Sequence, residues 1–174
     1  MDLRVEKTLQ AIKQAYYVIK RGKTIGQIRV TEICEKAMIN KSTFYKYYLD
    51  VYDLADKMET EIVRDLMATC KNADKLFSDT EAFVSEMTML IVSNLDRLKV
   101  IFDDRADVEI RKFEEYLMRL YLAKSHAAKR DEMIIRFCIG GAAHILMNER
   151  LTPENVYAAK SMFVEIVEKL HAGA

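Results

Sequence analysis

Six polar side chains lie within seven residues near the N-terminus, and their types suit contact with DNA. The segment Lys41–Tyr48 reads KSTFYKYY, and Phe44 and Tyr48 are four residues apart, which places them on one face of a helix. If that face packs inward, the outer faces carry Lys41, Ser42, Thr43, Tyr45, Lys46 and Tyr47. Side chains at the N-terminal end of such a helix reach base edges, while neighbouring cations and hydroxyls hold phosphates. A solvated turn between two core helices is the alternative interpretation.

Charge is divided unevenly along the chain. The 27 basic and 27 acidic residues cancel and the pI is about 6.8, which taken alone argues against a nucleic-acid partner. Residues 1–48, however, hold ten Lys and Arg against four Asp and Glu, hence +6, and residues 49–174 carry −6. A basic head on an acidic body favours binding to a polyanion, although chance asymmetry on a solvated surface would look the same.

The elements expected around this segment form a helix-turn-helix. Leu9, Ile12, Tyr16 and Ile19 make one apolar stripe, which predicts a helix over residues 2–20 that ends at Arg21-Gly22-Lys23. A second helix is expected over Val30–Ala37 and a third over Lys41–Tyr48, with Asn40 as the cap of the third. Two short helices separated by about three residues are typical of DNA-binding heads.

The rest of the chain is also expected to be helical. One proline and five glycines leave little of it marked as loop, so the fold class predicted is all-α. Helices are expected at about 50–71, 80–95, 106–126, 129–149 and 153–171, the last capped by Thr152. The stretch Met133–Met147 is apolar nearly all round and is expected at the centre of the body. These elements suggest a DNA-binding domain over residues 1–49 and a helical regulatory and dimerising domain over residues 50–174.

One longer pattern runs from Ile28 to Leu54 and reads IRVTEICEKAMINKSTFYKYYLDVYDL. It resembles the tetracycline-repressor (TetR) family of bacterial regulators, whose usual pattern is I-T-V-x-x-I-A-x-x-A-G-V-S followed by x-x-T-F-Y-x-H-F-x-x-K-x-x-L. The corresponding positions are Ile28, Val30, Ile33, Ala37, Ile39, Thr43, Phe44, Tyr45, Tyr48 and Leu54. The resemblance implies a sequence-specific DNA-binding regulator, by default a repressor released by a small-molecule effector. It also assigns Tyr45, Tyr47 and Thr31 chiefly to phosphates.

Three positions depart from that pattern. Met38 replaces the turn glycine, so the turn either accepts some strain or adopts a different geometry. Arg29 stands where the family usually has a capping threonine; it is a poor cap but suits a phosphate. Val51 replaces the lysine common at the start of the fourth helix, which removes one expected phosphate contact. These departures keep open an alternative, a TetR-like co-activator or interaction protein that does not itself read DNA.

The body is expected to bind itself and a ligand. Apolar surface on the helices 129–149 and 153–171, with Gly140 and Gly141 permitting close approach, predicts a homodimer. An apolar or aromatic effector is expected among Met87, Phe113, Tyr116 and His144, where adaptable methionines suit a cavity. Filled core is the alternative for these residues, and His144 is also interpreted as a core or interface histidine, or as a metal ligand.

Other functions find little support in the sequence. Cys34, Cys70 and Cys138 are far apart and lie among apolar positions, as reduced core thiols do. No cofactor motif, metal-binding spacing or catalytic constellation is present, so an enzyme is not expected. No stretch is long and apolar enough for a membrane span and no secretory signal opens the chain, so the expected compartment is the cytoplasm.

Overall fold

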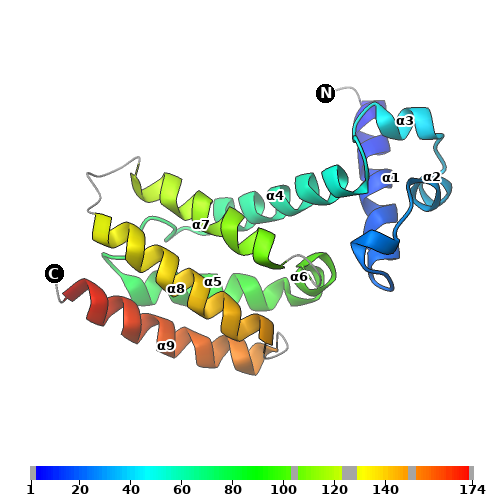
Figure 1. The fold of residues 1–174 in the computed structure, drawn as a ribbon. Helices are drawn as coiled ribbons and strands as arrows, with labels where there is room; N and C mark the ends of the chain where they lie inside the picture. Colours follow the sequence, from blue (N-terminus) through cyan, green and yellow to red (C-terminus); the bar gives the residue numbers. More distant parts are fainter. Residues whose placement is uncertain (1–2, 103–105, 123–128, 149–151, 173–174) are drawn as a thin grey trace. The chain divides into compact units, whose positions relative to one another are not determined.

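The computed structural model describes residues 3–102, 106–122, 129–148 and 152–172, and it confirms the all-α fold class (Figure 1). Within those ranges the chain forms helices joined by turns, with a short 3₁₀ helix at Ile25–Gln27. The α-helices are α1 (Leu3–Lys20), α2 (Val30–Ala37), α3 (Lys41–Tyr45), α4 (Val51–Thr69), α5 (Thr80–Ser93), α6 (Leu95–Phe102), α7 (Ala106–Leu122), α8 (Lys129–Asn148) and α9 (Pro153–Ala172).

The chain divides into two compact units, and the division falls within α4. The first unit comprises residues 1–62 and 100–105, and the second comprises residues 63–99 and 106–174. The boundary expected from the sequence lies earlier, at residue 49. The difference has a physical reason, because the first half of α4 contributes buried side chains, Val51, Leu54, Ala55 and Met58, to the first unit.

The first unit is built on α1. Its expected stripe is observed, since Ile12 and Tyr16 are fully buried while Leu9 and Ile19 are half-buried. Helix α1 contacts α2, and α2 contacts α3. An ion pair between Lys13 of α1 and Glu61 of α4 joins two elements of this unit.

The second unit is a helical bundle in which α9 lies against both α5 and α8, and α7 lies against α8 (Figure 1). Phe83, Leu117, Ile135 and Val167 are buried, one from each of these helices. The expected start of α9 is confirmed, because the N–H of Asn155 donates to Thr152 Oγ1 over 3.2 Å. No helix in the described part of the chain is long and apolar enough to cross a membrane.

Two expectations for the body are wrong. No helix is predicted between residues 95 and 106, yet α5 ends at Ser93 and α6 follows, with Leu95, Leu98 and Ile101 buried. The apolar stretch on α8 is also not enclosed throughout. Met133 is 64% exposed and Phe137, one turn later, is 66% exposed. Among the described side chains of α8, Ile134, Ile135, Cys138 and Ile139 are buried, so the helix buries one apolar face and exposes another.

The carboxylate of Glu86 on α5 is hydrogen-bonded to the connection between α4 and α5. Glu86 accepts hydrogen bonds at 2.8 Å from the backbone N–H groups of Lys71 and Asn72 and from Asn72 Nδ2. The N–H of Lys71, followed by that of Asn72, holds the pKa of Glu86 below its usual range. Burial, reinforced by the hydrogen bond to Glu86, raises the pKa of Cys70 to about 11, so this thiol is a donor to the carboxylate and not a nucleophile.

Replacing Glu86 with glutamine should destabilise the protein. The amide cannot accept all of these bonds, and losing a charge-assisted set costs about 1–3 kcal/mol at neutral pH. Because the folded pKa of Glu86 is lowered, its stabilisation is present above the ordinary glutamate pKa and lost as the pH falls through the folded value. Urea unfolding as a function of pH measures this difference. Glu81→Gln, on the same helix as Glu86, is the control, since the Glu81 carboxylate bonds to the side chains of Lys160 on α9 and Ser85 but to no backbone N–H of the connection. An equal effect of both variants would contradict the assignment.

Candidate nucleic-acid interface

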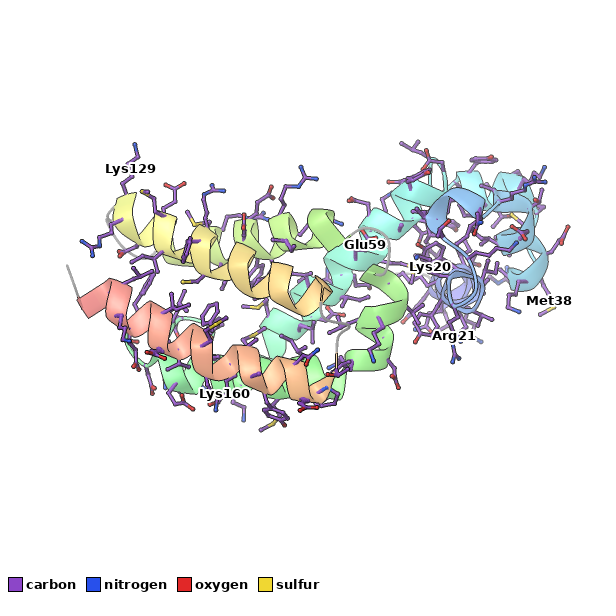
Figure 2. The ribbon with its side chains drawn as sticks, turned by 60° about the horizontal axis from the view of Figure 1, so that its bottom comes forward. Lys20, Arg21, Met38, Glu59, Lys129 and Lys160 are labelled. Atoms are coloured by element: carbon purple, nitrogen blue, oxygen red, sulfur yellow. The ribbon has the colours of Figure 1, made fainter. Side chains whose placement is uncertain are left out.

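A tight turn at Met38 separates α2 from α3. Met38 adopts the left-handed conformation, with φ of 54° and ψ of 45°. Its N–H donates to the carbonyl of Glu35 at 3.2 Å, and the N–H of Ile39 donates to that of Cys34 at 3.0 Å, which is a Schellman ending. Of the two alternatives for the missing glycine, the turn therefore keeps its geometry and accepts the strain. The Met38 side chain is 92% exposed and extends away from the ribbon (Figure 2).

The start of α2 is capped by Glu32 and not by Arg29. The carboxylate of Glu32 accepts a hydrogen bond from the N–H of Arg29 at 3.0 Å and also pairs with Lys23. Lys23, followed by the Arg29 N–H, holds the pKa of Glu32 below its usual range. The Arg29 side chain makes no capping bond and is exposed. A glutamate three residues after the cap position is a sequence signal that predicts this arrangement.

Asn40 caps α3, as expected. Its Oδ1 accepts the backbone N–H of Thr43 at 2.8 Å and the hydroxyls of Ser42 and Thr43 at 2.7 Å and 2.8 Å. Both hydroxyls therefore donate their single hydrogen to the Asn40 side chain. Either would have to rotate away from Asn40 before it could donate to a phosphate.

The C-terminal end of α3 differs from the prediction. The helix ends at Tyr45 and not at Tyr48, and the N–H groups of Tyr47 and Tyr48 both reach the carbonyl of Phe44, at 3.0 Å and 3.1 Å. The chain turns here because Asp50 already caps α4, accepting the N–H of Asp53 at 2.8 Å. The inward face is nevertheless as expected, since Phe44 and Tyr48 are buried with ring centroids 5.5 Å apart.

The predicted DNA-contacting residues divide by exposure. The exposed ones are Arg29, Lys41, Ser42, Tyr45 and Lys46, and the half-buried ones are Thr31, Thr43 and Tyr47. Within the described residues, neither Lys41 nor Lys46 has a carboxylate in salt-bridge range. Val51, where the resemblance would place a lysine, is buried at the start of α4. Of the predicted DNA-contacting residues, the exposed cations therefore lie at the start of α3, just after its end, and just before α2.

One charged residue at this surface was not found by sequence reasoning. Lys57 of α4 donates to the carbonyl of Tyr47 at 3.1 Å and to Asp53 Oδ2 at 2.9 Å. Lys57, followed by the N–H of Leu49, holds the pKa of Asp53 below its usual range. The spacing of Asp53 and Lys57 predicts their ion pair. The contact with Tyr47 depends on tertiary packing and leaves no local signal.

The predicted effector residues lie in the second unit. Met87 of α5 is buried, Phe113 and Tyr116 of α7 are half-buried, and the side chain of His144 on α8 lies outside the described residues. One hollow of about 400 Å³ in the described part of this unit is lined by none of them. It is lined by Phe77, Ser78, Asp79, Thr80, Glu81, Glu168 and His171. The effector site stays a prediction.

No protein-family model matches the chain, and a search of curated proteins finds no relative either. Functional assignment therefore depends on the residues and their geometry.

The strain at Met38 gives a direct prediction. Met38→Gly should stabilise the protein by about 0.5–1 kcal/mol, because the left-handed penalty of about 1–2 kcal/mol exceeds the added backbone entropy of glycine in the unfolded chain. Thermal unfolding measures the effect. Met38→Ala is the matched control, since it removes the same exposed side chain but keeps the positive φ. If alanine stabilised the protein as much as glycine, the gain would come from the lost apolar side chain and not from the backbone.

Proposed function

We propose that this chain is a sequence-specific DNA-binding transcriptional regulator that uses α2 and α3 as a helix-turn-helix. The observation that carries the proposal is the two-sided character of α3. Phe44 and Tyr48 anchor one side in the first unit, while Lys41, Tyr45 and Lys46 are exposed on the other. The resemblance of residues 28–54 to the TetR family is in accord with this function.

The contacts follow from where each exposed side chain lies. Lys41 is the first residue of α3, the end that enters the major groove, and is assigned to a base edge. Tyr45 and Lys46 lie at the opposite end and are assigned to phosphates, together with Arg29 before α2. The net charge of +6 over residues 1–48 adds long-range attraction.

We further propose that the protein acts as a homodimer joined through α8 and α9. Met133 and Phe137 form an exposed apolar strip on α8, and a side chain added at Gly141, one turn further, would meet no atom within 4 Å. On α9, Tyr157 and Met162 are exposed as well. A two-fold axis would bury such a face against its own copy and set the spacing of two DNA-binding heads.

Repression is the default mode of action, with release by an apolar effector in the second unit. Met87, Phe113 and Tyr116 are the residues assigned to that effector. A differential affinity of about 1–3 kcal/mol between the DNA-competent and incompetent head spacings is enough for a switch.

Replacing Lys46, just after α3, should affect DNA binding differently from replacing Lys41, at the start of α3. Lys46→Ala should weaken binding to all duplexes alike and lower the slope of log affinity against log salt by about one unit. Lys41→Ala should cost about 1–3 kcal/mol and relax preference at one base pair. Selection from a random duplex library followed by anisotropy titration in a salt series measures both effects.

Lys129→Ala is the matched control, because Lys129 is an exposed lysine at the start of α8 (Figure 2). It should leave affinity and slope unchanged. A uniform loss with both α3 variants would show that Lys41 does not read a base. The native protein is also tested in a gel shift with the intergenic DNA next to its gene. If it selects no duplex from the library and retards none of that DNA, the proposed function is wrong. The co-activator alternative then stands in its place.

The dimer should dissociate when a charge is placed on the exposed strip of α8. Phe137→Glu should change the mass in solution from about twice 20.2 kDa to the single-chain value, with little loss of stability because the side chain is 66% exposed in one chain. Light scattering measures the mass. Met89→Glu on α5 is the control, since Met89 has the same exposure. A native protein that runs as a monomer at micromolar concentration would contradict the assignment.

A further inference from the structure

The end of α3 is held by a side chain of α4. Helix α3 has only five residues, so few helical hydrogen bonds stabilise it. The carbonyl of Tyr47 lies beyond its last residue, and the ammonium of Lys57 donates to it over 3.1 Å. A cation suits this position because the carbonyl end of a helix is partially negative.

Two further contacts fix the position of that ammonium. Lys57 Nζ donates to Asp53 Oδ2, one turn earlier on α4, and lies 5.3 Å from the centroid of the Tyr48 ring. The same oxygen of Asp53 accepts the N–H of Leu49 at 2.9 Å. The backbone from Tyr47 to Leu49 is therefore bonded at both ends to one Asp–Lys pair, which we call the Asp53–Lys57 clasp.

We propose that Lys57 is a positioning residue, which with Asp53 holds the C-terminal end of α3 in the pose that presents Tyr45 and Lys46 to DNA phosphates. Lys57 acts through the Tyr47 carbonyl and does not itself bind DNA. This inference rests on the proposed function, because it takes α3 as the DNA-contacting helix.

The negative charge of Asp53 allows the proposal to be distinguished from a purely electrostatic explanation of the affinity. Removing a carboxylate close to a polyanion-binding surface should strengthen binding if long-range electrostatics alone decides the affinity. Removing Asp53 releases Lys57 and the N–H of Leu49, so the clasp predicts weaker binding. The two accounts give opposite signs for one substitution.

Affinity for the selected duplex is measured across a salt series for Lys57→Met, Asp53→Ala and the double variant, because alanine, unlike asparagine, leaves no oxygen to accept the bonds from Lys57 and Leu49. Each single variant is expected to bind about three- to tenfold more weakly, since each loses charge-assisted bonds that are partly exposed. The salt slope should stay at the native value, and the double variant should be no weaker than Lys57→Met alone, because both changes break one clasp. A slope lower by about one unit in Lys57→Met, or tighter binding by Asp53→Ala, would overturn the proposal.

Two variants serve as controls. Arg119→Met removes one cation and one i,i+4 ion pair from α7, and Glu35→Gln removes one exposed carboxylate from α2. Neither should weaken binding. A loss in Arg119→Met equal to that in Lys57→Met would mean that the affinity follows net charge. A loss in Glu35→Gln equal to that in the Asp53 variant would mean that any carboxylate change in the first unit weakens binding. Either result would leave the clasp without a special role.

Hydrogen exchange of the DNA-free protein separates failure of the clasp from failure of the proposed function. Lys57→Met should speed exchange of the Tyr47 and Tyr48 amides about three- to tenfold, with the amides of α1 unchanged and the protein still folded by circular dichroism. Unchanged exchange at these two amides would overturn the clasp whatever the protein binds. Faster exchange in a protein that selects no duplex would support the clasp and overturn the DNA-binding function.

Discussion

A helix of five residues such as α3 cannot maintain its own shape, and its neighbours in the first unit supply what it lacks. Asn40 caps the start of α3, Phe44 and Tyr48 are buried on its inner side, and Lys57 bonds the backbone just beyond its far end. The turn before it is fixed by a left-handed residue, although a side chain there costs free energy. Asn40, Tyr48 and Lys57 lie outside the helix, so its pose depends on the rest of the first unit.

Some of the cations in the first unit are paired with carboxylates. Lys13, Lys23 and Lys57 are paired with Glu61, Glu32 and Asp53. These pairs occupy cations on α1, on the loop before α2 and on α4. The cations left without such partners among the described residues include Lys41 and Lys46, on and just after α3. Positive charge without a carboxylate partner is thus present on both sides of the hydroxyls of Ser42 and Thr43.

Sequence reasoning predicted the features that depend on residues close together in the chain. The caps Asn40 and Thr152, the buried pair Phe44 and Tyr48, and the bounds of most helices follow from short-range spacing and capping chemistry. What sequence reasoning missed depends on partners distant in the chain. The early end of α3, the contact of Lys57 with Tyr47, and the exposed strip of Met133 and Phe137 are set by tertiary neighbours, which periodicity does not encode.

The division of the chain within α4 bears on how such heads can be exchanged in evolution or by protein engineering. A fragment that stops at residue 49 would lack Val51, Leu54, Ala55 and Met58, which are buried, and would also lose the Asp50 cap and the Asp53–Lys57 clasp. Recombination would therefore have to cut after Ile62, in the middle of a continuous helix. It would also have to replace residues 100–105, which belong to the same unit. The part that can be exchanged is thus not one continuous stretch of sequence.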